Sequence, residues 1–172
     1  MDSKEFNQLI LRTAFSCMAS DGHIDKREVA MIKDMCETSD LFVNFNFNAE
    51  IKSFVKQIKA EGKGFILDFF KLIETSELSV EQEIHLIDIA LKTIKADEQI
   101  EYSEVKFFKN IRHRLKVDDD IIRQNFSDIE EFLDRDINTE SLLDRLTSQY
   151  LDSMTSLHFE ELNSIDLNSD DV

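Results

Sequence analysis

Apolar residues recur at helical spacing along most of this chain. In residues 3–20 they fall at i, i+3, i+4, i+7, i+8, i+11 and i+12, the single stripe of an amphipathic helix. The same period returns in seven later segments, whose inward residues span 29–36, 51–58, 65–73, 84–94, 105–115, 121–133 and 142–157. The pattern predicts an all-α fold, a single helical domain of about seven or eight helices.

Cap and breaker residues indicate where these helices begin. Ser79 with Gln82 has the spacing of a capping box, and Asn48 is a candidate cap for the third helix. The three acids from Asp118 suit a helix start, where the partial positive charge favours them. Residues 38–48 lack the helical period, and we expect an extended linker there. The fifth helix, about 80–95, has the broadest apolar face, so we expect it to be the most central.

A nine-residue stretch occurs twice, and both copies join two predicted helices. Residues 20–28 read Ser-Asp-Gly-His-Ile-Asp-Lys-Arg-Glu, and residues 96–104 read Ala-Asp-Glu-Gln-Ile-Glu-Tyr-Ser-Glu. The offset is 76 throughout, and apolar positions before and after the stretch match at the same offset. Internal similarity of this kind indicates repeated structural units. The sequence therefore predicts two pseudo-repeated helix-corner-helix hairpins.

The acids of the two corners are the candidate site. Asp21 and Asp97 each follow a helix, where the C-terminal partial charge disfavours a carboxylate by a few tenths to about 1 kcal/mol. Free N–H groups at the start of the next helix could compensate, so that the acids act as caps. A cation could do so instead. Hard ions such as Ca²⁺, Mn²⁺ and Mg²⁺ suit carboxylate clusters, and the candidate ligands are Asp21, Asp25, Glu28, Asp97, Glu101 and Glu104. Neither corner supplies the oxygen ligands of a complete EF-hand loop.

Composition indicates one helical domain of ordinary size. The 172 residues include 14 Phe, three Gly and no Pro, which favours long helices around a core rich in Phe. No apolar run reaches the roughly 18–20 residues of a membrane span, so direct membrane insertion is not expected. The first residues lack the apolar region of a signal peptide, and we expect a cytoplasmic protein. Cys17 and Cys36 are predicted to be buried free thiols.

The charge is strongly negative and unevenly distributed. The net charge is −16; residues 1–117 hold 20 acids and 17 bases, and residues 118–172 hold 16 acids and three bases. Such a chain repels phosphate backbones and anionic membranes, so no nucleic-acid partner is expected. The acidic segment 118–172 is either a set of helices with a solvated face or a docking surface for a basic partner.

Catalytic motifs are missing from the sequence. It contains no Gly-x-Ser-x-Gly, Cys-x-x-Cys or His-Glu-x-x-His, and its four histidines have no Cys or His partner at zinc spacing. We therefore expect a protein that is not an enzyme.

The doubled corner resembles the TerB-like family of tellurite-resistance proteins. The family's element is an Ala-Asp-Gly-x-Ile-x-x-x-Glu corner that occurs twice in an all-helical domain. Here Ser20 replaces the alanine of the first copy and Glu98 the glycine of the second. The resemblance covers residues 3–117 and extends toward 135, which gives a TerB-like domain at 1–135 and an acidic helical extension at 136–172, packed on the domain or partly mobile.

The resemblance implies a non-catalytic cytoplasmic module linked to tellurite and other chemical stress. It also implies metal binding through the corner acids and protein partners associated with membranes. The alternative that the residues themselves favour is a protein-interaction adaptor whose acidic C-terminal face binds a basic partner.

Overall fold

The protein folds into α-helices, as the hydrophobic pattern predicts. A computed structural model describes residues 1–21, 24, 26–37, 46–96, 100 and 102–133. Within these residues there are eight α-helices, one short 3-10 helix and no strand. They are α1 (Ser3–Met18), η1 (Ala19–Asp21), α2 (Lys26–Glu37), α3 (Phe47–Glu61), α4 (Lys63–Thr75), α5 (Val80–Ile94), α6 (Tyr102–Arg114), α7 (Asp119–Asn125) and α8 (Glu130–Leu133). None of the described helices is long and apolar enough to cross a membrane.

Side-chain caps fix several helix starts. Ser79 accepts a hydrogen bond from the Gln82 N–H while the Gln82 side chain accepts from the Ser79 N–H, which confirms the predicted capping box. The predicted cap of α3 is wrong by two residues. Asn46, not Asn48, accepts from the Ala49 N–H, because α3 already begins at Phe47. Of the predicted extended linker, residues 38–45 lie outside the described part.

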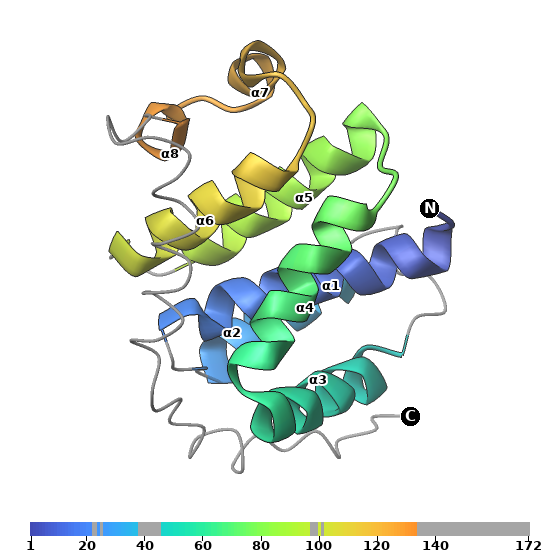
Figure 1. Ribbon diagram of the computed structural model, residues 1–172. Helices are drawn as coiled ribbons and strands as arrows, with labels where there is room; N and C mark the ends of the chain where they lie inside the picture. Colours follow the sequence, from blue (N-terminus) through green and yellow to red (C-terminus); the bar gives the residue numbers. More distant parts are fainter. Residues whose placement is uncertain (22–23, 25, 38–45, 97–99, 101, 134–172) are drawn as a thin grey trace.

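Helix α1 is the centre of the fold. It packs against α2, α3, α4, α5 and α6, and most extensively against α5. In Figure 1 it crosses the middle of the molecule, with α5 and α6 on one side and α3 on the other. The expectation that the fifth helix is the most central is therefore wrong. The reason is that α1 also buries Asn7 and Ser16, polar residues outside its apolar stripe that a hydrophobic pattern assigns to the surface.

Phenylalanine fills much of the core between α1, α3, α4 and α6. The Phe65 ring of α4 lies 5.7 Å from the Phe15 ring of α1 and 5.9 Å from the Phe54 ring of α3. On the other side of α4, Phe70 lies 5.2 Å from Phe107 of α6. Edge and tilted contacts of this kind are favourable beyond the area that they bury. Cys17 and Cys36 are both buried and form no disulfide, as predicted.

The segment after α6 forms two short helices instead of one. The apolar period at 121–133 predicts a continuous helix, but α7 ends at Asn125 and α8 begins at Glu130. Between them Asp128 has a φ of 59°, a left-handed conformation that interrupts a helix. The break leaves Ile122, Ile129 and Phe132 all buried. The predicted helix start is confirmed, because Asp118 caps α7 by accepting from the Asp120 N–H.

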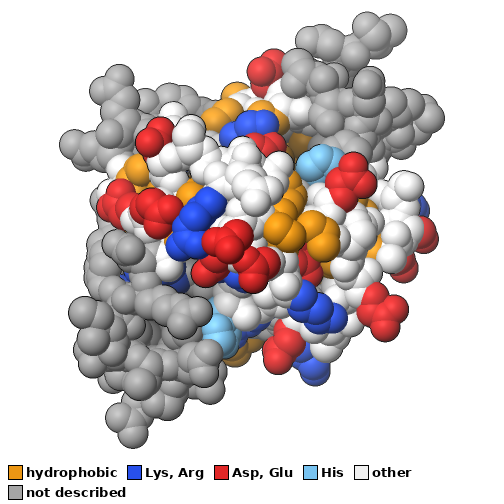
Figure 2. Space-filling model, turned by 90° about the horizontal axis from the view of Figure 1, so that it is seen from above, with side chains coloured by type: hydrophobic (Ala, Val, Ile, Leu, Met, Phe, Trp, Pro, Cys, Tyr) orange, Lys and Arg blue, Asp and Glu red, His pale blue; other side chains and the backbone are white. Residues whose placement is uncertain are grey.

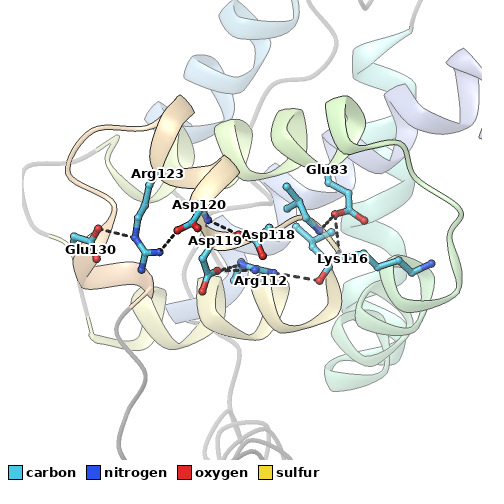
Figure 3. Close-up of polar contacts among 10 residues, drawn as sticks. Glu83, Arg112, Lys116, Asp118, Asp119, Asp120, Arg123 and Glu130 are labelled. Carbon is cyan, nitrogen blue, oxygen red and sulfur yellow. Dashed lines mark hydrogen bonds and ion pairs between the residues drawn. The ribbon is translucent and has the colours of Figure 1, made fainter.

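A buried carboxylate fastens the loop between α6 and α7 to α5. Glu83 is only 4% exposed, and its Oε2 accepts the backbone N–H groups of Lys116 at 2.9 Å and Val117 at 2.5 Å (Figure 3). Arg112 donates to Asp119 and to the Leu115 carbonyl in the same turn. These bonds hold the start of α7 against the end of α6.

The boundaries of the helices follow the sequence repeat. With the offset of 76, α1 and α2 correspond to 79–94 and 102–113, within one residue of α5 and α6. Outside the nine-residue stretch itself, the apolar residues matched at this offset are all buried or partly buried. The two corners nevertheless differ, since Ile24 is 2% exposed and its counterpart Ile100 is 41% exposed. Whether the two hairpins share one three-dimensional arrangement stays a prediction.

Candidate functional site: the corners and a groove beside α1

The structure describes only part of the predicted corner site. Asp21 is the last residue of η1, and its side chain is outside the described part of the structure. Asp25, Asp97 and Glu101 lie outside the described residues altogether. Glu28 and Glu104 are described, and each is the third residue of its helix, α2 or α6. Acids in a first helical turn interact favourably with the N-terminal partial charge, as the capping interpretation requires. Among the described residues, no group of three His, Cys, Asp or Glu could hold a metal ion.

The described parts of the two corners lie against each other. η1 contacts α6, and α1 contacts α6 as well. Burial raises the pKa of the Cys17 thiol well above its usual range, and the Glu104 carboxylate raises it further. An acid of the second copy therefore lies beside the helix that leads into the first. The hydroxyls of Ser16, Ser20 and Ser103, on α1, η1 and α6, are buried without a hydrogen bond.

A groove lies on the side of α1 that faces α3 and the end of α4. Its volume is about 760 Å³, and it is partly open to solvent. Leu9 and Phe54 form its floor but are only 1% and 5% exposed, so exposed Met1 and half-buried Leu72 supply most of its accessible apolar surface. Gln8 of α1 donates to the Glu50 carboxylate of α3 at 3.0 Å, which ties the two helices together at the groove.

Arg12 is the one basic side chain among the described residues of the groove. Its guanidinium stacks on the Phe65 ring at 4.5 Å, and its Nη2 donates to the Phe65 carbonyl at 3.2 Å. Burial lowers the pKa of Arg12 from its ordinary value, against the opposing effect of Asp68 and Glu61. Its Nε is buried without a hydrogen bond. Arg12 is thus held in place by stacking more than by an ion pair.

The groove carries more negative than positive charge. Glu5, Glu50 and Glu77 supply three carboxylates, against Arg12 and the amino group of Met1. The Met1 amino group points to the Glu77 carbonyl at 3.5 Å. Apolar surface beside acidic side chains suits a partner helix that has one apolar face and basic residues next to it.

Sequence reasoning missed this groove. Its residues come from three separate stretches, and Gln8, Arg12 and Glu50 look like ordinary surface positions of amphipathic helices. A signal would have required the relative orientation of α1 and α3, which the hydrophobic period does not contain.

Three of the six described acids in the acidic segment pair with arginine. Asp119 accepts from Arg112 at 2.6 Å, and Arg123 donates to Asp120 and Glu130 (Figure 3). The hydrogen bond to Glu130 raises the pKa of the Arg123 guanidinium. Figure 2 shows acidic, basic and hydrophobic side chains interspersed on the face seen there, with no large area of one sign. Residues 136–172 lie outside the described part.

Comparison of the chain with models of known protein families, with curated proteins and with solved structures gives no match in any of the three. The resemblance to TerB-like proteins therefore rests on the two corner motifs alone.

Proposed function

We propose that this chain is a non-catalytic helical adaptor of the TerB-like kind, which binds a basic amphipathic helix of a protein partner in the groove beside α1. The observation that carries the proposal is the groove itself. It combines the apolar side chains of Met1 and Leu72 with three carboxylates, above a floor of Leu9 and Phe54 and on a framework that Gln8 and Arg12 hold in place.

Several features support a binding role. An amphipathic helix that lies in a groove uses apolar anchors for affinity and charged neighbours for orientation. The strongly negative net charge also favours a basic partner, by speeding the encounter. Association with tellurite or other chemical stress belongs to the same proposal and depends on the corner motifs.

A designed peptide tests the groove. We expect a helix of about 15 residues, with leucine on one face and lysine beside it, to bind the full chain and to shift the NMR signals of Leu9 and Leu72. Reversing two exposed rim charges with Glu5→Lys and Glu77→Lys should weaken binding about five- to tenfold, since exposed charge pairs contribute modestly.

The matched control reverses two exposed acids outside the groove, Glu74→Lys and Glu81→Lys, so that the net charge is the same. Equal weakening in both variants would show that the peptide responds to overall charge, and the groove proposal would then fail. A peptide with glutamate in place of lysine should bind less tightly than the lysine form.

A weak divalent-cation site at the corners is the second candidate function. It is favoured by the contact of η1 with α6 and by the position of Glu104 beside Cys17, since both bring the two acidic corners together. Carboxylate oxygens suit Ca²⁺, Mn²⁺ or Mg²⁺. The candidate ligands remain the six corner acids.

Thermal unfolding tests the cation site. At a concentration about tenfold above Kd, a bound ion should raise Tm by roughly 3–6 °C. Asp21→Asn with Asp97→Asn should abolish the rise, whereas Glu81→Gln with Glu131→Gln, two exposed acids elsewhere, should leave it unchanged. A rise that persists in the Asp21 and Asp97 variant, or no rise with any of the three ions, contradicts the site.

A further inference from the structure

One helix of this acidic protein presents a row of lysines. Lys52, Lys56 and Lys59 of α3 are all exposed, and their spacing of four and three residues places them on one side of the helix. The two acids of α3 face α1 instead. Glu50 accepts a hydrogen bond from Gln8 of α1, and the carboxylate of Glu61 raises the pKa of Arg12 of α1. Charges on α3 are therefore separated, with acids toward α1 and lysines away from it.

The opposite charge gathers at the end of the chain. Residues 146–172 contain six acids and neither lysine nor arginine. We infer that this acidic segment docks on the lysine row of α3 in the same molecule. The inference does not depend on the groove, because the lysines lie on a different side of α3 from Glu50, which lines the groove.

The chain is long enough for this contact. α8 and α3 lie at opposite ends of the molecule in Figure 1. A folded domain of this size has a radius of gyration of about 14 Å, so it is some 35–40 Å across. The chain must run over the surface, and half the circumference of such a domain is roughly 55–60 Å. Residues 134–151, which precede the first of the six acids at Asp152, can span about 60 Å when extended. A segment tethered in this way has an effective concentration on the order of millimolar, which lets weak charge pairs form a populated contact.

Docking of this kind competes with an external basic partner. The same carboxylates cannot be paired with α3 and with the lysines of another protein at once. The contact is also sensitive to salt, because the Debye length falls from about 8 Å at 0.15 M to about 3 Å at 1 M. An external partner can therefore bind the acidic segment only after that segment is released from α3.

Spin-label distances in the full chain test the inference. Labels on Ala60→Cys, exposed near the lysines, and on Ser164→Cys should report a short-distance population at low salt. The native Cys17 and Cys36 are buried, so they compete little for the label. Lys52→Glu, Lys56→Glu and Lys59→Glu together should reduce the docked-to-undocked ratio at least about fivefold, since three exposed charge pairs are lost.

The control reverses three exposed lysines elsewhere, Lys4→Glu, Lys71→Glu and Lys116→Glu, which changes the net charge equally and should keep the short distance. Lys→Gln at the three α3 positions, and 1 M NaCl on the parent chain, should weaken the contact without reversing any charge. An equal loss in the control and α3 variants overturns the inference. So does a short distance that disappears when labelled protein is diluted with unlabelled protein, because the contact would then join two copies.

Discussion

Phe65→Ala lowers the free energy of unfolding by about 3–5 kcal/mol, the range for removal of a buried phenylalanine. Phe65 is fully buried in α4, with the rings of Phe15 and Phe54 within 6 Å of its own. The substitution leaves a cavity between three helices. It also removes the ring on which the Arg12 guanidinium stacks. Urea unfolding followed by circular dichroism measures the loss.

Leu67→Ala is the control on the same helix. Leu67 is 50% exposed, so its truncation should change the unfolding free energy by no more than about 0.5 kcal/mol. A loss below about 1 kcal/mol for Phe65→Ala would mean that α1, α3 and α4 do not pack around this ring.

Glu83→Ala should destabilise the protein by about 2–4 kcal/mol. The change removes a carboxylate that accepts two backbone N–H groups, those of Lys116 and Val117. Val117 is 3% exposed, so its N–H group loses its partner away from solvent. Buried donors left without an acceptor each cost roughly 1–3 kcal/mol. The same urea titration gives the value, and amide hydrogen exchange at Lys116 and Val117 should become faster.

Two further variants separate the hydrogen bonds from the charge. Glu83→Gln keeps an acceptor oxygen and should cost less than Glu83→Ala. Glu81→Ala, at an exposed position two residues earlier, should cost at most about 0.5 kcal/mol. If Glu81→Ala and Glu83→Ala had equal effects, the bonds to the loop after α6 would not stabilise the fold.

Helix formation in this protein depends mainly on residues close together in the chain, so the sequence predicts the helices well. The apolar period identifies α1 to α6, and the Ser79 capping box predicts the first residue of α5 correctly. Each of these features depends on residues at most four positions apart, so it is visible without the fold. The predicted start of α3 is wrong because Asn46 and Asn48 can both act as caps.

The predictions from the sequence are wrong mainly where the local structure depends on residues far away in the chain. The break between α7 and α8 contradicts the helical period at 121–133, because packing of Ile129 and Phe132 into the core requires the chain to turn at Asp128. Glu83 lies within the predicted fifth helix, and its role depends on backbone N–H groups 33 and 34 residues away. No local pattern contains such a partner.

Of the two candidate sites, the corners can be identified from the sequence, whereas the groove can be identified only from the fold. The sequence alone determines two acidic corners at an offset of 76, and the helix boundaries follow the same offset. Only the tertiary structure buries Ile24 but exposes Ile100, and only it joins Leu9, Phe54 and Arg12 in one groove. The physical reason is that helix propensity and capping act within one turn, whereas burial depends on which helix lies opposite.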